Sequence, residues 1–156
     1  MRGQKHRIME LNKALDEAYM REALKEARMA FDADEVPIGA VMVCKGKIIA
    51  KAHNLTERLN DFTAHAEMQA FTSASDYLGG KYLDDCTLYV TLEPCMMCGG
   101  AAFWTKLGRI VYGASDEKRG VGRFREEVLH PKTLVTADVL AEESSAMLKE
   151  YFKGKR

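Results

Sequence analysis

The stretch TLYVTLEPCMMC, residues 87–98, changes from a strand pattern to a helix pattern within a few positions. Residues 87–91 form a short β-type run, and Pro94 is expected at the first position of a helical segment over 95–106. A further β-type run follows over residues 109–114. Because strands that alternate with helices build layered sheets, this passage predicts an α/β fold.

The chain before this stretch predicts a helix and a β-hairpin. Apolar residues recur at helical spacing over residues 16–34, and this amphipathic helix should end before Pro37. Its apolar positions are Met20, Leu24, Ala27 and Phe31. Two β-type runs follow, 40–44 and 48–50, with Gly46 in the short turn between them.

The remaining elements complete the alternation. Residues 63–71 are interpreted as the start of a second helix, with Thr63 as its cap. A basic loop that contains glycines leads to a weaker β-type run at 134–135, and the chain closes with an amphipathic helix over 140–152. The full order predicts a three-layer α/β/α sandwich with a central mixed five-stranded sheet.

The composition is typical of one globular domain. Of the 156 residues, 47% are hydrophobic, 29% are charged and only three are proline. With no internal repeat or linker, we expect one domain over residues 1–156, with 1–15 as a flexible tail. The 23 basic and 23 acidic residues balance, which excludes a strongly basic nucleic-acid binder of the histone kind but not a local basic patch.

The sequence has neither a secretory signal pattern nor a membrane-span pattern. No long apolar region follows the basic start, and charges interrupt every apolar run before the roughly 18 residues that a bilayer span needs. We therefore expect a cytoplasmic protein without a membrane partner. Because thiols stay reduced in that compartment, regularly spaced cysteines are better explained as metal ligands or catalytic groups than as disulfides.

Two motifs predict a catalytic metal site. The HAE motif at 65–67 precedes the PCMMC motif, and together they offer one imidazole and two thiolates as zinc ligands. Cys95 and Cys98 reach one ion from the first turn of a helix, whose positive end favours thiolates, and His65 is expected in the first turn of its own helix. Three ligands leave one zinc position open for water, and Glu67 is close enough to take the proton of that water.

The spacing Cys-x-x-Cys is also typical of structural zinc knuckles and redox pairs. A structural site needs a fourth ligand, and Cys86 is the only nearby thiol. Cys86 precedes a strand pattern and Cys44 lies in the hairpin, so both are better explained as ordinary buried cysteines. A non-catalytic RNA-binding module with a structural zinc nevertheless stays open as an alternative.

The two motifs resemble the zinc-dependent cytidine and deoxycytidylate deaminase superfamily, whose signature is H-x-E followed by P-C-x-x-C. Within it, the chain resembles the bacterial tRNA-specific adenosine deaminases from about residue 19 to residue 152. The stretches that carry the likeness are EVPIGAV (35–41), AHN (52–54), TAHAE (63–67), LYVTLEPCMMC (88–98) and VYGASD (111–116). The resemblance implies a cytidine deaminase-like fold.

The resemblance also implies a role for each motif residue. His65, Cys95 and Cys98 would bind zinc, and the water activated there would attack carbon 6 of an adenine. Glu67 would pass a proton to the ring nitrogen and then to the departing ammonia, which leaves inosine. Asn54 matches the family asparagine that hydrogen-bonds the flipped base, although an asparagine here is also an ordinary turn residue.

The substrate that the resemblance implies is a tRNA anticodon stem-loop with adenosine at the wobble position. Tyr151 and Phe152 match an aromatic pair that lies along the RNA, although either ring also suits packing of the last helix on the core. Asp116 matches an aspartate near the substrate. Basic residues available for phosphate contacts are Lys118, Arg119, Arg123, Arg125, Lys153, Lys155 and Arg156. Family members are homodimers whose partner subunit helps to build the RNA groove, so a homodimer is expected.

The chain departs from the family pattern in the loop GVGRF, residues 120–124, where many relatives have small residues. Guanine and cytosine deaminases share the zinc motif, but they often carry proline between the cysteines, where this chain has Met96 and Met97. A deaminase of free bases or nucleosides, guanine or cytosine, is therefore the second hypothesis.

Overall fold

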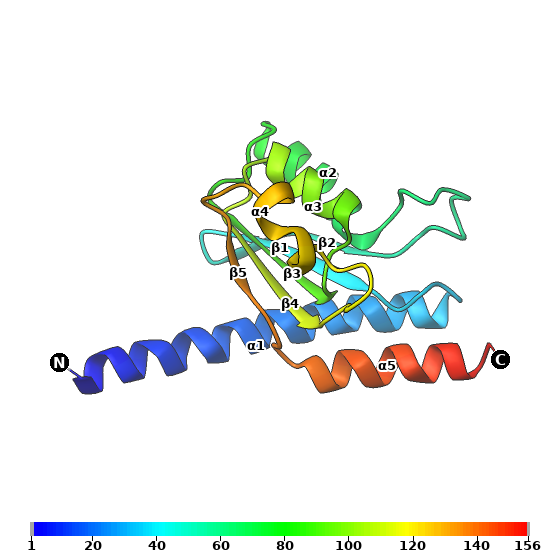
Figure 1. The fold of residues 1–156 in the computed structure, drawn as a ribbon, viewed down its shortest axis with the longest axis horizontal. Coiled ribbons are helices and arrows are strands. Elements are labelled where there is room, and N and C mark those ends of the chain that lie inside the picture. The colour runs from blue at the N-terminus through cyan, green and yellow to red at the C-terminus, as the bar shows by residue number, and fades with distance from the viewer. Residues whose placement is uncertain (1, 156) are drawn as a thin grey trace.

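The computed structural model describes residues 2–155 and confirms the predicted three-layer α/β/α sandwich (Figure 1). Its five strands form one mixed sheet in the order β2-β1-β3-β4-β5. The pairs β2–β1 and β1–β3 are antiparallel, whereas β3–β4 and β4–β5 are parallel. The strands are β1 (Gly39–Cys44), β2 (Lys47–His53), β3 (Cys86–Leu92), β4 (Arg109–Ala114) and β5 (Leu134–Thr136).

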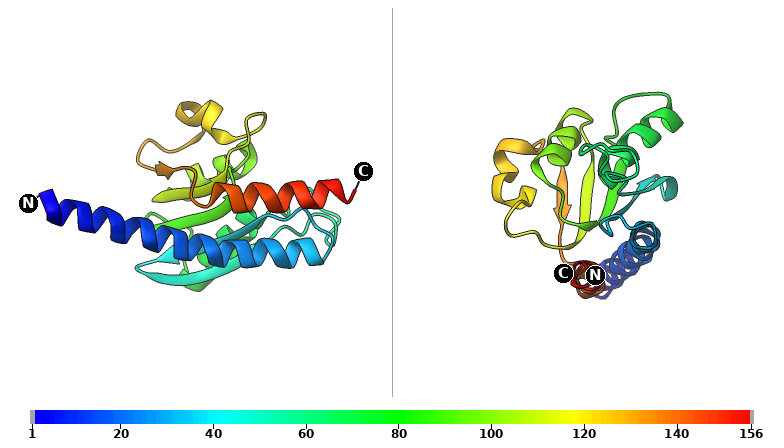
Figure 2. Two further views of the ribbon diagram at one scale, coloured as in Figure 1. Left: turned by 90° about the horizontal axis from the view of Figure 1, so that it is seen from below. Right: turned by 90° about the vertical axis from the view of Figure 1, so that its right-hand side faces the viewer.

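Helices cover both faces of this sheet. The helices are α1 (Arg2–Asp32), α2 (Ala66–Leu78), α3 (Met96–Trp104) and α5 (Ala141–Lys153), with the short η1 (Val121–Phe124) and α4 (Arg125–Val128) after β4. Helices α2 and α3 lie on one face, whereas α1 and α5 lie side by side on the other (Figure 2). The sequence pattern missed η1 and α4, because helices this short carry too few turns to show a periodicity.

The predicted hairpin is confirmed, with β2 longer than expected. Lys45 and Gly46 both adopt positive φ angles, 52° and 75°, which is the geometry of a two-residue turn between antiparallel strands. Glycine at the second position takes this backbone conformation without the steric cost that a side chain would add.

Helix α1 begins at Arg2, far before the predicted start near residue 16. Residues 2–15, expected to be a flexible tail, are helical, and all of them are exposed. Their sequence favours a helix because Arg, Gln, Lys, Leu, Met and Glu dominate it. The periodicity argument missed this part because the segment has no buried face.

Two hydrophobic clusters hold the layers together. Met42, Leu88 and Ile110 pack with α2 and α3, whereas Val41 and Tyr89 pack against α1. Because successive strand residues point to opposite faces, a sheet covered on both sides needs apolar residues at nearly every position. All six residues of β1 are accordingly buried.

A polar network lies beneath α1. Both carboxylate oxygens of Asp16 accept hydrogen bonds from Arg109, at 2.9 and 2.7 Å, and Oδ1 also accepts one from the Tyr89 hydroxyl at 2.7 Å. Arg109 donates in addition to Thr136 Oγ1 at 2.9 Å. The network ties α1 to β3, β4 and β5.

Over residues 2–155, none of the helices combines the length and the apolar character that crossing a membrane requires.

Candidate active site

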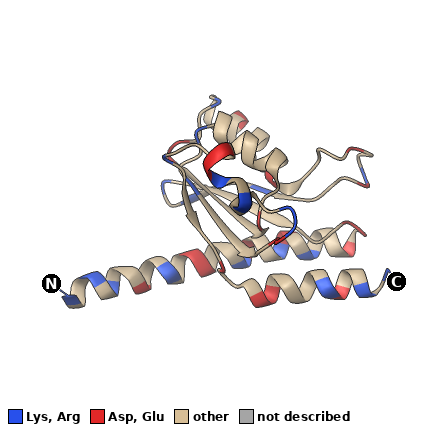
Figure 3. Cartoon of the chain, viewed as in Figure 1, with Lys and Arg blue, Asp and Glu red and all other residues tan. Residues whose placement is uncertain are grey.

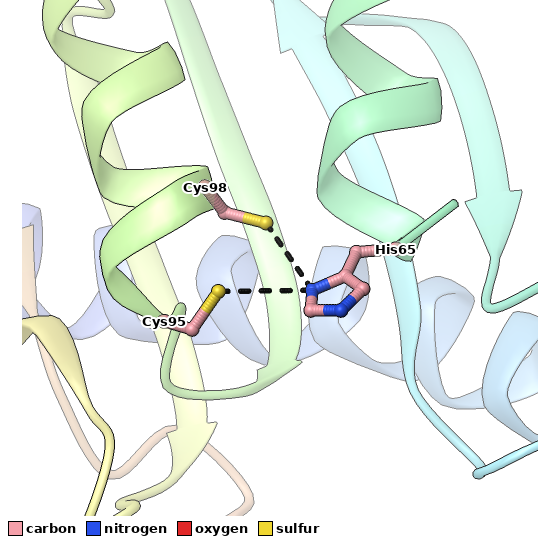
Figure 4. A group of neighbouring side chains, drawn as sticks. All are labelled: His65, Cys95 and Cys98. Carbon is pink, nitrogen blue, oxygen red and sulfur yellow. Dashed lines mark hydrogen bonds between the residues drawn. The ribbon is translucent and has the colours of Figure 1, made fainter. Parts of the chain in front are cut away.

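Three potential metal ligands meet where the N-termini of α2 and α3 converge (Figure 4). His65 Nδ1 is 3.7 Å from Cys95 Sγ and 3.5 Å from Cys98 Sγ. All three ligand atoms lie within 4.8 Å of one another, so one ion can contact all of them. The structure thus brings together the three side chains that the sequence predicted as ligands.

His65 and Cys95 are N-caps of their helices, with extended backbone at φ −68°, ψ 154° and φ −77°, ψ 177°. The predictions that His65 lies in the first turn and that Pro94 is the first helical residue are therefore wrong. Thr63 does not cap α2 either, because the N-cap is His65; the Thr63 hydroxyl instead donates to Asp61 Oδ1 at 2.7 Å. Both ligands still lie at the positive ends of helix dipoles, as expected, and this position favours thiolate over thiol.

Hydrogen bonding distributes the protons of the ligand group unevenly. Hydrogen bonds from Cys98 and from His65 lower the pKa of Cys95 to about 3. The same Cys95–Cys98 contact and burial raise the pKa of Cys98 well above its usual value. The hydrogen bond to Cys95 also raises the pKa of His65. These contacts favour the thiolate form of Cys95, which is the form of cysteine that binds metals.

Cys86 lies away from this group. It is the cross-strand partner of Cys44 in the β1–β3 register, and both are buried. Burial, together with a hydrogen bond to Cys44, raises the pKa of Cys86 to about 12. Within residues 2–155, the ligand group contains only its one histidine and two cysteines, so the structural-zinc alternative lacks its fourth ligand.

Two buried polar atoms near the ligand group have no hydrogen-bond partner. Glu67 Oε1 and Asn54 Oδ1 are the only such side-chain atoms in the described chain, and their residues are 4% and 5% exposed. A hydrogen bond from Leu55 N to Ala64 O, at 3.0 Å, places Asn54 beside the residues that lead to His65. Unpartnered buried polar groups are rare because each costs stability, so they mark a place where a ligand completes the site.

This arrangement fits a zinc ion. One imidazole and two thiolates are zinc donors, and three protein ligands leave a coordination position for a reactant. Glu67 lies one residue after the start of α2, with Cys98 among its neighbours. Burial raises the pKa of Glu67, which suits a group that must take up and release a proton near neutral pH.

The Asp116 side chain organises its own turn. Its Oδ1 accepts hydrogen bonds from the backbone N–H groups of Lys118, at 3.2 Å, and Arg119, at 3.1 Å. The residue is half-buried at the start of the loop after β4.

The aromatic pair of α5 divides into two environments. The Tyr151 hydroxyl donates to Asp34 O at 3.1 Å, and its ring meets Phe31 edge-on with centroids 5.7 Å apart. Tyr151 therefore packs α5 on the end of α1, which is the structural explanation considered for these rings. Phe152 is 47% exposed and faces solvent.

The basic residues expected to contact phosphate are exposed, and acidic residues lie among them (Figure 3). Two of them have intramolecular partners: Arg123 donates to the carbonyls of Glu117 and Lys118, and Lys155 pairs with Asp34. Arg156 lies outside the described residues. Lys118, Arg119, Arg125 and Lys153 are the remaining members of the set.

Sequence reasoning missed two buried carboxylates beside the site. Glu35 accepts hydrogen bonds from the backbone N–H groups of Glu57 and Arg58, and Glu93 accepts them from those of Asp116 and Gly122. A carboxylate that binds backbone groups leaves no periodic pattern. The only signal was a charged residue next to an apolar strand, in the stretches EVPIG and TLEPC.

The chain is similar in sequence to known deaminases. The profile of the MafB19-like deaminase family matches residues 15–156. The tRNA-specific adenosine deaminase of Bacillus subtilis strain 168 is 46% identical over 143 residues, which cover 88% of this chain and 89% of that protein. The chain belongs to the tRNA-specific adenosine deaminase family. Residues 2–14 of α1 lie outside the match to the deaminase profile.

Solved structures place the tRNA-specific adenosine deaminases among other deaminases. A structure from a study of A-to-I editing by tRNA:A34 deaminases at the wobble position is 43% identical, with a TM-score of 0.79, and the match covers 84% of this chain and 99% of that one. The guanine deaminase from Nitrosomonas europaea is 26% identical, with a TM-score of 0.75, over 86% of this chain and 83% of that one. The fold alone therefore does not decide between an RNA and a free base as substrate.

Proposed function

We propose that this chain is a zinc-dependent enzyme that hydrolyses adenosine to inosine at the wobble position of a tRNA anticodon loop. The observation that carries the proposal is the buried, unpartnered Glu67 oxygen beside a His/Cys/Cys group. The 46% identity to a tRNA-specific adenosine deaminase supports the choice of substrate.

His65 Nδ1, Cys95 Sγ and Cys98 Sγ would hold the zinc ion. Zinc supplies Lewis acidity, which makes water a nucleophile at neutral pH. The two thiolates offset the charge of the ion, so they keep a dication acceptable in a half-buried site.

Glu67 moves the proton in this proposal. Its carboxylate takes a proton from the attacking water and passes it to the purine ring nitrogen. It then takes the remaining proton of the added hydroxyl and passes it to the leaving amine. One water is consumed and one ammonia is released, so adenosine becomes inosine. The burial that raises the pKa of Glu67 prepares it for both halves of the transfer.

Asn54 orients the base. Its Oδ1 atom is buried without a partner, and an N–H group of the bound base can donate to it. Such a bond removes the cost of the unpartnered oxygen only when a base is present, which makes the contact selective.

The RNA would lie across exposed aromatic and basic residues of the loop after β4 and of α5. Phe152 offers a stacking surface, and Lys118, Arg119 and Lys153 offer phosphate contacts. Asp116 positions the turn that carries two of these cations, and Tyr151 fixes the helix that carries Phe152. A homodimer, in which the partner subunit helps to build the RNA groove, and a cytoplasmic location, where tRNA is available, are parts of the same proposal.

A substrate panel tests this function. Zinc-loaded protein is incubated with an anticodon stem-loop bearing wobble adenosine and, separately, with free adenosine, cytidine and guanine, with Glu67→Ala as control. Conversion of only the stem-loop, read by mass spectrometry and absent in the control, is the expected result. An unchanged stem-loop would refute the proposal.

The second candidate is a deaminase of free guanine or cytosine. It is favoured by the fold shared with the guanine deaminase from Nitrosomonas europaea. Conversion of a free base in the same panel would keep the roles of the ligands and of Glu67 but replace the substrate.

A further inference from the structure

Glu93 stands two residues before the predicted zinc ligand Cys95, at the end of β3, and it is buried. Its Oε1 accepts a hydrogen bond from the backbone N–H of Asp116 at 2.9 Å, and its Oε2 accepts one from that of Gly122 at 2.7 Å. One carboxylate therefore bridges both ends of a single loop, residues 116–122.

The glycines of this loop allow it to wrap around the carboxylate. A Cβ atom on Gly120 would lie 2.2 Å from Glu93 Cδ, and one on Gly122 would lie 2.7 Å from Glu93 Oε2. Gly120 has an ordinary φ of −67°, so the need there is for space and not for an unusual backbone conformation. The space that the Glu93 carboxylate takes up accounts for glycine at both positions.

The loop is also fastened to the turn that carries the metal ligand. Val121 N donates to Pro94 O at 2.8 Å, and Gly120 forms an isolated antiparallel bridge with Cys95. The same loop carries Lys118 and Arg119, two of the exposed cations assigned to RNA phosphates. Glu93 thus lies where the turn that carries Cys95 meets the 116–122 loop.

We propose that Glu93 is a positioning residue: it holds the 116–122 loop against the metal-binding turn and so sets the position of that loop relative to the bound RNA. The inference rests on the proposed function, because the loop matters only if RNA is the substrate. Glu93 acts through the backbone N–H groups of Asp116 and Gly122, each bound to one of its two oxygens.

Glu35 provides a matched comparison on a different loop. Its two oxygens accept hydrogen bonds from Glu57 N, at 2.8 Å, and Arg58 N, at 2.9 Å, and so hold the loop that follows Asn54. The two carboxylates make the same kind of contact to different loops. Removing one should loosen only its own loop.

Amide hydrogen exchange followed by NMR tests the contact without any activity assay. In Glu93→Gln, one carboxylate oxygen becomes an NH₂ group that cannot accept, so exchange of at least one of the Asp116 and Gly122 amides should accelerate about tenfold or more. The Glu57 and Arg58 amides should stay unchanged. Glu35→Gln should give the reverse pattern. Acceleration of both loops in both variants, or of neither loop, would overturn the proposal.

Kinetics then separate positioning from a general structural role. Glu93→Gln should raise KM for the stem-loop about tenfold, while kcat and the zinc content change little. Glu142→Gln, at an exposed carboxylate on α5, should match the wild type. If Glu93→Gln does not fold, Glu93→Asp takes its place in these measurements, because aspartate keeps the charge but its side chain is too short to reach both amides. Loss of zinc, or an unchanged KM, would contradict the positioning role. If the wild type itself does not convert the stem-loop, the proposed function fails, and the exchange pattern still decides the contact.

Discussion

The polar network under α1 and the ligand group between α2 and α3 both contain buried polar side chains, but they differ in whether these side chains have hydrogen-bond partners. Under α1, both Asp16 oxygens are hydrogen-bonded, and Arg109, Tyr89 and Thr136 supply or share the partners. At the ligand group, Glu67 Oε1 has no partner, and neither does Asn54 Oδ1 directly after β2. Satisfied buried polar groups stabilise one structure, whereas an unpartnered group lowers stability by about 1–3 kcal/mol. The comparison therefore separates a region built for the fold from one built for a reaction.

The metal ligands give the largest expected effect. Cys95→Ser should remove zinc and abolish conversion of the stem-loop, because the described residues 2–155 offer the ion just three ligands. Cys86→Ser changes a buried cysteine outside the ligand group, so this variant should retain its zinc and its conversion of the stem-loop. For both variants, atomic absorption measures the zinc content and an activity assay measures the turnover of the stem-loop. Loss of zinc from the Cys86 variant would restore the structural-zinc alternative.

Replacing Asn54 should affect the substrate more than the fold. Asn54→Ala removes an acceptor that has no partner in the protein, so kcat/KM for the stem-loop should fall about tenfold to a hundredfold while the free energy of unfolding changes little. Steady-state kinetics and urea unfolding measure the two quantities. A large loss of stability with normal kinetics would make Asn54 an ordinary turn residue.

Replacing Asp16 with asparagine should affect the fold more than the reaction. Asp16→Asn removes the charge that pairs with Arg109 and should lower the free energy of unfolding by about 3 kcal/mol, because Arg109 would keep a partly buried charge without its ion-pair partner. The activity of the folded fraction should stay normal. Urea unfolding together with turnover below the transition tests this. Reduced turnover at full folding would show that the two regions are coupled.

Deleting residues 2–14 should have the smallest effect. These residues are exposed along the start of α1 and lie outside the match to the deaminase family. Helical signal in circular dichroism should decrease in proportion to the residues removed, whereas zinc content and turnover should not change. A drop in turnover would show that residues 2–14 contribute to the activity.

The sequence predicted those parts of the fold that carry periodic patterns. The strand runs at 87–91 and 109–114 appear as β3 and β4, with β4 over its predicted bounds. The start of α1 was missed because residues 2–15 bury nothing, so their helix rests on propensity alone. Helix boundaries near the site shifted because the ligands His65 and Cys95 occupy cap positions.

The candidate site was predictable where side chains share one short motif. Cys95 and Cys98 follow from their spacing, and His65 joins them through the H-x-E motif. The supporting carboxylates Glu35 and Glu93 were not predictable, because their partners are backbone amides of distant loops. The roles of Asp116, Tyr151 and Phe152 toward RNA stay predictions.

Glu67→Gln tests the comparison most directly, because it changes the carboxylate whose Oε1 atom has no hydrogen-bond partner in the protein. The free energy of unfolding and the stem-loop turnover of this variant should be measured on the same zinc-loaded preparation. We predict unchanged or higher stability, full zinc content, and turnover reduced by about 10²–10⁴-fold. A variant that loses stability but keeps its turnover would contradict the account, because Glu67 would then serve the fold and not the reaction.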